Sequence, residues 1–528
     1  MNQDFKNALW ATANKLRGAV DPAEYKYPVL GLIFLKYVSE SFAARQAELT
    51  TAFADPKNEF YLDDEAMRAG ELEERDYYRA SNTFWVPEKA RWSFIQANAK
   101  QPNIAVLLDD AMRLVEEDNP KLANLLPKVY VRTTLEQNTL GTLIDLVASI
   151  DFGQGEHKGD VLGDVYEYFL GNFAGAEGKN AGEFYTTSSI VNIIVEVLAP
   201  KKGKLFDPAC GAGGMFVSTK KFSTAHGGRV ADLSIYGQER NPNTWKIAAM
   251  NLAIRGLDFN LGQKPGDTFT EDQHPDLKAD YILMNPPFGA GTEWSKESLT
   301  NDPRWVYGIP PAKPAHFAWL QHALYHMSSK GQAGIVMPNG TLTTTQGGED
   351  TIRQRMIEDD VVECIISLPG QLFLNTQIPC CLWFLAKDKT KNGRDRCGET
   401  LFIDARKMGY LKDRVNRAFT DEDIQKIAQT VHLWREDEDR TPITEGQEQQ
   451  SYLDIPGFCK SANLEEIKER GFVLSPGRYC GSEDVEDSDE VFETRMGELV
   501  AQLKELFAKS NNLQQQVKNG LKELGYEL

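Results

Sequence analysis

A short apolar run from Tyr281 to Met284 is followed by Asn285 and two prolines, and this feature constrains the fold more than any other. The run has the length and composition of a buried strand. Pro286 and Pro287 donate no ladder hydrogen bond and fix their own φ, so the strand must end there. The sequence therefore predicts that the Asn285 amide and the Phe288 ring lie together at the carboxyl end of a strand, where ligands bind in open α/β sheets.

The groups gathered at this strand end suit one kind of ligand. An amide oxygen and rigid backbone carbonyls accept hydrogen bonds from an amine, and an aromatic ring stacks on a flat surface. Asn285 and Phe288 are thus expected to hold a planar group that carries an exocyclic NH2.

Strand and helix patterns alternate through the middle of the chain, which is typical of a mostly parallel sheet with crossover helices. The expected strands cover residues 204–207, 234–239, 259–261, 281–284, 334–338, 361–368, 380–386 and 401–404. The expected helices cover residues 160–173, 190–198 and 315–330, with further helices beginning at Met215 and Asn241. These patterns predict an α/β fold.

The flanking segments differ from this α/β core. Residues 1–152 have helical spacing, and we predict a helical N-terminal domain there. Within it we expect a break at Pro22, a new helix at Tyr27–Pro28, helices over 103–117 and 134–150, and an aromatic loop over 84–94. Residues 153–480 form the expected α/β domain, with a charged loop over 434–448 and a short ordered patch over 471–479. Residues 481–528 are predicted to be an acidic linker and an amphipathic helix that docks on a partner subunit or on its own chain.

The formal charge of −19 bears on possible partners. A protein that holds DNA alone usually shows a basic face or a basic balance. If DNA is the substrate, we expect either a more basic partner or one locally basic face, although acidity can also serve solubility alone. No leader segment and no apolar run long enough to span a membrane are visible, which favours a cytoplasmic location without membrane contact.

The metal-binding and disulfide-forming residue types are scattered. Seven cysteines form no CxxC pair and are expected to be reduced thiols. His322 and His326 share a helix face, but no HExxH glutamate or carboxylate cluster accompanies them. We therefore expect no metal site.

Three further motifs lie at or near the ends of predicted strands. Residues 207–214 read Asp-Pro-Ala-Cys-Gly-Ala-Gly-Gly, a glycine turn that lets backbone approach a ligand closely. No Gly-Lys-Ser/Thr follows, which excludes a P-loop. Glu239 ends the next strand and is placed to accept from two ribose hydroxyls. Asp267 is either an acceptor for an adenine amino group or a simple turn aspartate.

In this order, the motifs resemble the S-adenosylmethionine-dependent amino-methyltransferases of DNA, which methylate the exocyclic nitrogen of adenine or cytosine. The resemblance implies a Rossmann-like domain, S-adenosylmethionine as cofactor and no metal for methylation. Asparagine at the first position of the tetrapeptide favours adenine N6 in that family. The catalytic residues that the resemblance implies are Asn285, Pro286, Pro287 and Phe288. The cofactor-binding residues that it implies are Asp207, Gly211, Ala212, Gly213, Glu239 and Asp267.

Upstream segments narrow the resemblance to the modification (M) subunit of type I restriction–modification systems. Residues 182–186, Gly-Glu-Phe-Tyr-Thr, look like the family's cofactor-covering motif, and residues 160–167 resemble the helix before it. The family commonly has Pro and Arg after this motif, where this chain has Thr187 and Ser188. The cofactor-covering residues that the resemblance implies are Glu183, Phe184, Tyr185, Thr186, Thr187 and Ser188.

The same resemblance implies a multisubunit complex. Double-stranded DNA is the expected substrate, and a target adenine must leave the base stack for its N6 to be reached. A separate specificity (S) subunit is expected to choose the target sequence, beside a second copy of the M subunit and, optionally, a restriction (R) subunit.

Two other functions fit part of the pattern. A protein-glutamine methyltransferase could hold a side-chain amide with the same tetrapeptide, but such enzymes are much shorter. A scaffold with a vestigial cofactor site is the non-enzymatic alternative, against which the intact glycine turn and tetrapeptide argue.

Overall fold

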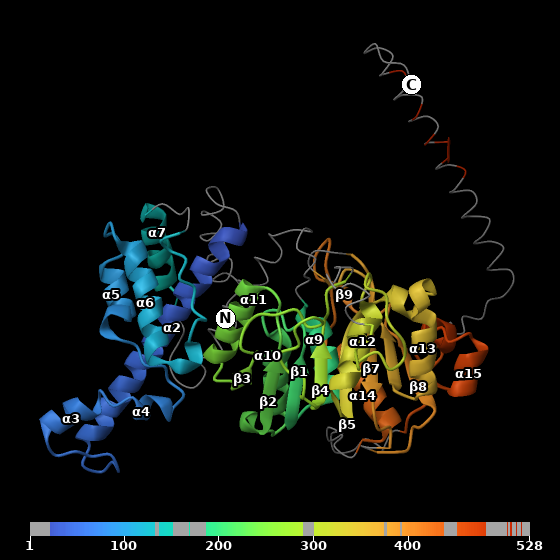
Figure 1. Ribbon diagram of the computed structural model, residues 1–528, viewed down its shortest axis with the longest axis horizontal. Helices are drawn as coiled ribbons and strands as arrows, with labels where there is room; N and C mark the ends of the chain where they lie inside the picture. The colour runs from blue at the N-terminus through green and yellow to red at the C-terminus, as the bar shows by residue number, and fades with distance from the viewer. Residues whose placement is uncertain are drawn as a thin grey trace.

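The computed structural model describes residues 22–132, 137–150, 186–288, 300–373, 377–390, 393–437 and 451–481, together with single residues at 168, 504, 507, 508, 510, 514 and 519 (Figure 1). The predicted helix over residues 160–173 and the predicted linker and amphipathic helix after residue 481 lie outside the described ranges. So do Glu183, Phe184 and Tyr185.

The N-terminal region is helical, as predicted. Its α-helices are α2 (Pro22–Ala54), α3 (Glu65–Glu71), α4 (Asp76–Arg79), α5 (Trp92–Ala97), α6 (Ile104–Asp118) and α7 (Gln137–Ala148). Helix α6 shows why they form: Leu108, Met112 and Val115 recur at helical spacing and are buried together in the core of this region.

Two expectations for this region were wrong. Helix α2 begins at Pro22, where the sequence predicted an interruption, but it continues through Pro28, where the sequence predicted that a new helix would begin. The residues after Pro28, from Val29 to Leu35, are buried in the core, and this burial outweighs the one backbone hydrogen bond that proline removes. The predicted aromatic loop also contains α5, which begins at Trp92 because Trp92 and Ile95 both pack into the same core.

The α/β region is built on one nine-stranded sheet. Its strand order is β11-β8-β6-β7-β5-β4-β1-β2-β3, with β7 antiparallel to both of its neighbours, β11 antiparallel to β8, and all other pairs parallel. The strands are β1 (Gly203–Asp207), β2 (Leu233–Gly237), β3 (Phe259–Asn260), β4 (Ala279–Met284), β5 (Met327–Pro338), β6 (Val362–Ser367), β7 (Cys380–Ala386), β8 (Glu399–Asp404) and β11 (Cys459–Asn463). The predicted mostly parallel α/β fold is confirmed.

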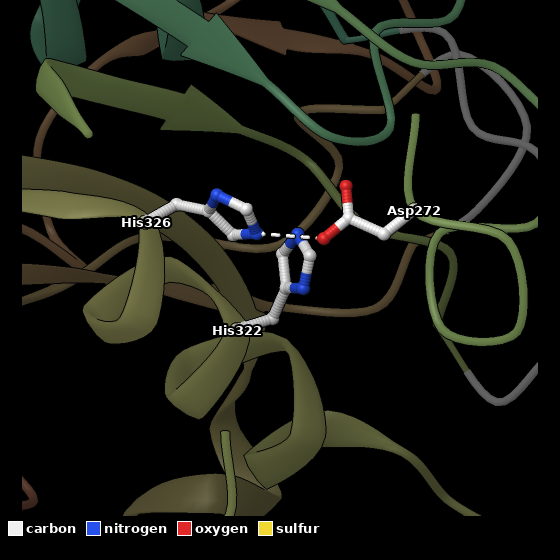
Figure 2. Close-up of side chains that lie close together, drawn as sticks. All are labelled: Asp272, His322 and His326. Atoms are coloured by element: carbon white, nitrogen blue, oxygen red, sulfur yellow. Dashed lines mark hydrogen bonds and ion pairs between the residues drawn. The ribbon is translucent and has the colours of Figure 1, made fainter. Parts of the chain in front are cut away.

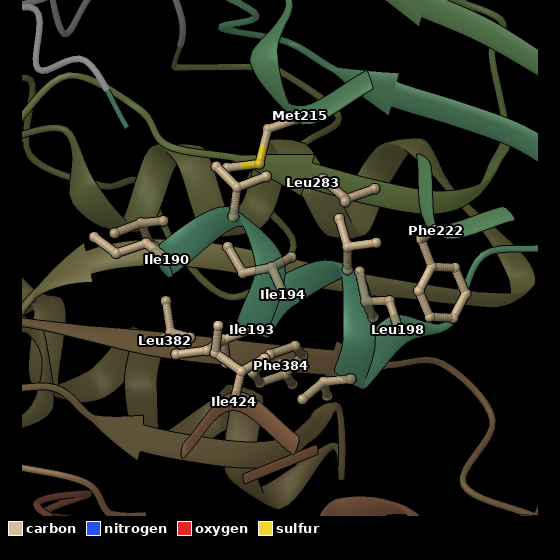
Figure 3. Close-up of a cluster of buried hydrophobic side chains, with 14 of the residues drawn as sticks. Ile190, Ile193, Ile194, Leu198, Met215, Phe222, Leu283, Leu382, Phe384 and Ile424 are labelled. Carbon is tan, nitrogen blue, oxygen red and sulfur yellow. The ribbon is translucent and has the colours of Figure 1, made fainter. Parts of the chain in front are cut away.

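Helices cover both faces of this sheet. They are α9 (Ser188–Leu198), α10 (Gly214–Ala225), α11 (Pro242–Ile254), α12 (His316–His326), α13 (Glu349–Glu358), α14 (Asp421–Arg435), α15 (Leu464–Glu469) and α16 (Gly477–Cys480). Helix α9 is apolar on nearly all sides, because it lies between the sheet and the helices α10 and α14. Figure 3 shows Ile190 and Ile194 of α9 among Leu283 of β4, Phe384 of β7 and Ile424 of α14.

Two boundaries in this region differ from the prediction. The helix expected over 315–330 ends at His326, and β5 begins at Met327 because that residue pairs with Ala279 of β4. The loop expected from Trp434 onward was also misplaced, since Trp434 lies in the last turn of α14 and is fully buried.

The helical region packs against the β3 edge of the sheet, next to α11 (Figure 1). Met250 and Ile254 of α11 belong to the same hydrophobic core as α2. Tyr37 of α2 donates a hydrogen bond to the Ile254 carbonyl at 3.3 Å.

All seven cysteines are free, as predicted. Six are buried, and Cys397 is exposed just before β8, at the edge of the sheet where the parallel strands begin. Among the helices in the described ranges, none combines the length and apolar character that a membrane crossing requires.

Candidate active site

Three adjacent parallel strands bring the predicted site residues to one edge of the sheet. Strand β1 pairs with β4 on one side and with β2 on the other, through Phe206–Ile282 and Asp207–Gly237. Asp207 ends β1, Glu239 follows β2 by two residues, and Asn285 comes directly after β4. The glycine turn, the acidic strand end and the tetrapeptide are therefore neighbours at the carboxyl edge, where α/β sheets bind ligands.

The glycine turn links β1 to α10. Gly211 and Gly213 both have left-handed backbones, with φ of +51° and +81°, which glycine adopts without strain. The Cys210 N–H donates to the Gln238 carbonyl at 2.9 Å, which ties the turn to the residue after β2. Apart from the chain neighbours of Gly211, no atom of the described residues lies within 4 Å of the position that a Cβ on Gly211 would take, so the backbone there is open to a ligand. The Ala212 carbonyl instead accepts from Asn251 Nδ2 at 2.7 Å.

Glu239 is nine-tenths buried, and backbone amides fix its carboxylate. The Gly211 N–H donates to Oε2 at 3.1 Å, and the Asn241 N–H donates to Oε1 at 2.7 Å. Asn241 also caps α11, as predicted, because its side chain accepts from the N–H groups of Asn243 and Thr244. The carboxylate is thus a fixed acceptor attached to both the glycine turn and α11.

Asp207 is buried behind the turn, with Oδ1 accepting from the Ala209 N–H at 3.0 Å. Burial, reinforced by the negative charge of Glu239 and opposed by that hydrogen bond, raises the pKa of Asp207 to about 8. The Glu239 carboxylate and the Asp207 carboxyl group are both largely shielded from water, and a cationic ligand at this edge would favour the ionised form of each.

Asp267 sits in a turn of its own. Its Oδ1 accepts from the Phe269 and Thr270 N–H groups at 3.0 and 3.1 Å, and Arg240 lies 3.9 Å from Oδ2. The sequence left two roles open for Asp267, an acceptor for an adenine amino group or a simple turn aspartate. These hydrogen bonds are those of a turn aspartate. Gln238, which the sequence did not single out, fixes the loop by donating from Nε2 to the carbonyl of Gly266 at 3.1 Å.

Asn285 is held by Thr186, which belongs to the segment predicted to cover the cofactor. Its Nδ2 donates to Thr186 Oγ1 at 2.7 Å. Its Oδ1 is buried and accepts from none of the described residues, and Thr187 Oγ1 is also buried without a partner among them. Buried polar atoms without partners are uncommon and costly, so these two oxygens are candidates for contacts with a ligand. Ser188 begins α9.

The aromatic part of the site contains a ring that the sequence did not reveal. Phe288 is half-buried, and its ring meets that of Phe373 edge to face, with centroids 5.9 Å apart and planes at 86°. Phe373 lies in the connection between β6 and β7, 85 residues away along the chain, so no local pattern could pair the two. Pro286 is buried.

A second cluster of titratable groups lies close by. Asp272, His322 and His326 bring their ligand-type atoms within 4.8 Å of one another (Figure 2). The sequence showed no HExxH glutamate or carboxylate cluster beside the two histidines, but one carboxylate, Asp272, joins them from a loop that is distant in the sequence. His326 Nε2 lies 3.0 Å from Asp272 Oδ2. Burial alone would raise the pKa of Asp272, but the hydrogen bond and charge of His326 hold it below its usual value.

The chemistry of this cluster does not suit a metal ion. Arg304 Nη1 lies 3.1 Å from His322 Nδ1, and a guanidinium can only donate. His322 therefore accepts at Nδ1 and, when neutral, carries its proton on Nε2, whereas a metal ligand nitrogen must be unprotonated. Burial and the charges of His326 and Arg304 also hold the pKa of His322 well below its usual value. Arg304 donates to the carbonyls of Thr268 and Phe269 at 3.1 and 2.7 Å, so the cluster supports the loop that carries Asp267.

The geometry fits an adenosyl cofactor with a cationic end. The glycine turn leaves backbone exposed, Glu239 offers two fixed acceptor oxygens, and Asp207 adds a second buried carboxyl group. These features match what the site would need to hold S-adenosylmethionine.

Comparisons with known proteins agree with this site. The N-6 DNA methylase family matches residues 157–488, and the HsdM N-terminal domain family matches residues 5–147. The chain is 46% identical to the type I restriction enzyme HindI methylase subunit of Haemophilus influenzae, over 84% of this chain and 100% of that protein. It is 36% identical to the type I restriction enzyme MjaIX methylase subunit of Methanocaldococcus jannaschii, over 100% of this chain and 92% of that protein.

A solved structure shows the same architecture. The type I restriction–modification system methyltransferase subunit from Streptococcus thermophilus superposes with a TM-score of 0.72 at 26% identity, covering 90% of this chain and 99% of that one. With the family match over more than half of its length and with relatives above 30% identity, the chain belongs to the N-6 DNA methylase family, among the type I restriction enzyme methylase subunits.

Proposed function

We propose that this chain transfers a methyl group from S-adenosylmethionine to N6 of an adenine flipped out of duplex DNA, with Asn285 as the residue that holds the amine. The observation that carries the proposal is the orientation of the Asn285 amide. Because Nδ2 is engaged with Thr186, Oδ1 is the atom left to accept a hydrogen bond. An adenine amino group has two hydrogens to donate, and the Pro286 carbonyl is the acceptor proposed for the second.

The two acceptors act on the nitrogen itself. Hydrogen bonds from both N6 hydrogens favour a pyramidal amine, whose lone pair then points away from the ring and toward an incoming methyl group. A strong general base is not needed before attack, and positioning supplies much of the acceleration. Phe288 is proposed to stack on the flipped base, with Phe373 fixing the tilt of the Phe288 ring. Pro287 keeps the segment between Asn285 and Phe288 rigid.

The cofactor roles follow from the positions of the acidic groups. Bound S-adenosylmethionine supplies an electrophilic methyl group on a sulfonium. Glu239 is proposed to accept from ribose hydroxyls, and Asp207 with the turn from Gly211 to Gly213 to hold the cationic end. Asp267 is proposed to accept from the cofactor's adenine through Oδ2, since its turn uses Oδ1. Residues 183–188 are proposed to cover the cofactor, and no metal takes part in the methylation.

The proposed organisation is that of a type I complex. Residues 1–152, 153–480 and 481–528 are proposed as the helical, catalytic and docking parts of the chain. A specificity subunit chooses the DNA sequence, a second M subunit and an optional restriction subunit complete the assembly, and the complex acts in the cytoplasm. Family membership favours this function over methylation of protein glutamine.

The proposal is tested by Asn285→Ala in the full-length chain assembled with its specificity subunit. We expect methyl transfer to DNA to fall by at least about a hundredfold, by analogy with loss of one preorganised hydrogen-bonding group. Cofactor affinity measured by calorimetry should stay close to that of the wild type. Asn103→Ala is the matched control, because Asn103 is exposed and its side chain caps nothing. Equal loss of cofactor binding and transfer, or a wild-type complex that methylates no DNA, would contradict the proposal.

A further inference from the structure

A small hairpin extends from the carboxyl edge of the sheet after β8. Its strands are β9 (Tyr410–Leu411) and β10 (Arg417–Ala418), paired antiparallel. Gly409 makes the entry to it possible: its φ is +80°, and a Cβ there would lie 2.7 Å from the Ala418 carbonyl oxygen. At the tip, the Lys412 N–H donates to the Asn416 carbonyl at 2.9 Å, so the loop has a defined shape.

The hairpin is attached to both segments that contact the tetrapeptide. The Arg417 N–H donates to the Gln371 carbonyl at 2.8 Å, two residues before the Phe373 that meets Phe288. Just after β10, the Phe419 N–H donates to Ser189 Oγ at 3.2 Å, three residues after the Thr186 that holds Asn285. Figure 1 shows β9 at the upper edge of the sheet, near α9. A duplex that presents a base to Asn285 must therefore pass close to this hairpin.

The surface of the hairpin is basic and apolar, in contrast to the acidic balance of the whole chain. Residues 407–417 hold four basic residues and one acidic residue, a formal charge of +3 in a chain of −19. The basic residues are Lys407, Lys412, Arg414 and Arg417. Between them, Tyr410 is 48% exposed, Leu411 57% and Val415 50%. Exposed apolar side chains gathered on one small element and flanked by charged residues are typical of an interaction site.

We propose that this hairpin is a DNA-contacting element of the subunit, lying against the duplex beside the extruded adenine. The inference rests on the proposed function and goes beyond it by naming where this chain touches the DNA around its target. Lys412 and Arg414 at the tip contact phosphates, whose charge they complement. Tyr410 and Leu411 contact the bases next to the vacated position, as apolar wedges do in proteins that deform DNA.

The electrostatic part is tested by Lys412→Gln/Arg414→Gln in the full-length chain assembled with its specificity subunit. Binding to duplexes with and without the target site is followed by fluorescence anisotropy over a salt series. Loss of two phosphate contacts should weaken binding to both duplexes and reduce the slope of log affinity against log salt by about 2. Lys202→Gln/Lys204→Gln is the control, because both lysines are exposed at the opposite edge of the sheet, and its slope should equal that of the wild type.

The apolar part is tested by Tyr410→Ala/Leu411→Ala, with 2-aminopurine in place of the target adenine. The fluorescence increase that reports base extrusion should shrink, and methyl transfer should slow by about tenfold, in line with the loss of one base-stacking side chain. Cofactor affinity should not change, which shows that the variant is folded.

Three outcomes separate the possibilities. Wild-type salt dependence and wild-type extrusion in the hairpin variants of an active complex would overturn this inference while the proposed function stands. Failure of the hairpin variants to co-purify with the specificity subunit would also overturn it, because the hairpin would then be a subunit contact. A wild-type complex that binds cofactor but methylates no DNA would overturn the proposed function instead.

Discussion

Asn285 Nδ2 and Thr186 Oγ1 lie 2.7 Å apart, and this hydrogen bond determines which end of the Asn285 amide is left to meet a ligand. The two residues are 99 positions apart in the sequence. The threonine thus orients the amide that we propose to be catalytic, whereas the sequence suggested only a cofactor contact for it.

Thr186→Val should therefore slow methyl transfer more than it weakens cofactor binding. Without the hydroxyl, the Asn285 amide can turn by 180° and present NH2 where an acceptor is needed. Loss of one such bond costs about 1 kcal/mol, or about fivefold in rate. The rate of methyl transfer in a single turnover measures this loss. Thr186→Ser keeps the hydroxyl and should behave as the wild type; equal slowing in both variants would show that the hydroxyl is not what matters.

Glu239→Gln should weaken cofactor binding. The substitution removes the charge and places an NH2 group opposite the N–H of Gly211 or Asn241, both of which need an acceptor. Hydrogen bonds to a charged group are worth about 2 kcal/mol, which predicts an increase of about thirtyfold in Kd by calorimetry. Glu465→Gln, on the exposed face of α15, is the control and should leave Kd unchanged.

Cofactor binding should depend on pH through Asp207. Its pKa of about 8 means that the free protein holds this carboxyl mostly protonated at pH 7. A cationic ligand favours the carboxylate, so binding should release a proton near pH 7, and affinity should rise as the pH increases toward 8 and level off above it. Calorimetry in buffers of different ionisation enthalpy measures the number of protons that are released when the cofactor binds. Cofactor binding to the Asp207→Asn variant should release no proton. If the binding enthalpy of the wild type did not depend on the buffer, Asp207 would not lose a proton on binding.

Phe373→Leu should impair transfer although Phe373 is far from the tetrapeptide in sequence. The edge-to-face contact with Phe288 is worth about 1 kcal/mol, so we expect about a fivefold loss in kcat/KM for DNA. Phe373→Tyr keeps the ring and should retain most of the activity. A leucine variant with unchanged kcat/KM would mean that Phe288 keeps its orientation without this neighbour.

Arg304→Met should destabilise the α/β region and weaken cofactor binding together. It leaves the nearly buried Asp302 carboxylate without its partner, which typically costs about 3–5 kcal/mol, and it frees the Thr268 and Phe269 carbonyls. Arg229→Met breaks an exposed pair with Asp232 and should cost less than about 1 kcal/mol. The melting temperatures of the two variants are measured with and without cofactor. Similar melting temperatures for Arg304→Met and Arg229→Met would contradict the supporting role of Arg304.

Local signals explain which parts of the site could be predicted from the sequence. Strand β4 ends where its two prolines require, α11 begins at the Asn241 cap, and the glycines of the turn have the positive φ that only glycine adopts easily. Each of these features depends on residues a few positions apart, which a sequence displays directly.

The features that were missed depend on distant residues or on weak local patterns. The Phe288–Phe373 and Asp272–His326 contacts join different loops and helices, so no spacing reveals them. Helix α14 did have a readable signal, the capping box of Thr420 and Asp423. The charged residues after Trp434 obscured that signal, and the prediction placed a loop over the end of the helix.

The exposed Cys397 provides a site for labelling the protein with a thiol-reactive dye. Since the other six thiols are buried, a maleimide dye should attach at one position, on the side of the sheet away from the Asn-Pro-Pro-Phe segment. A hydrogen bond to Asp395 raises the pKa of the Cys397 thiol, so mildly alkaline buffer should speed the coupling. Dye placed there could report energy transfer to labelled oligonucleotides without obstructing the edge that receives them.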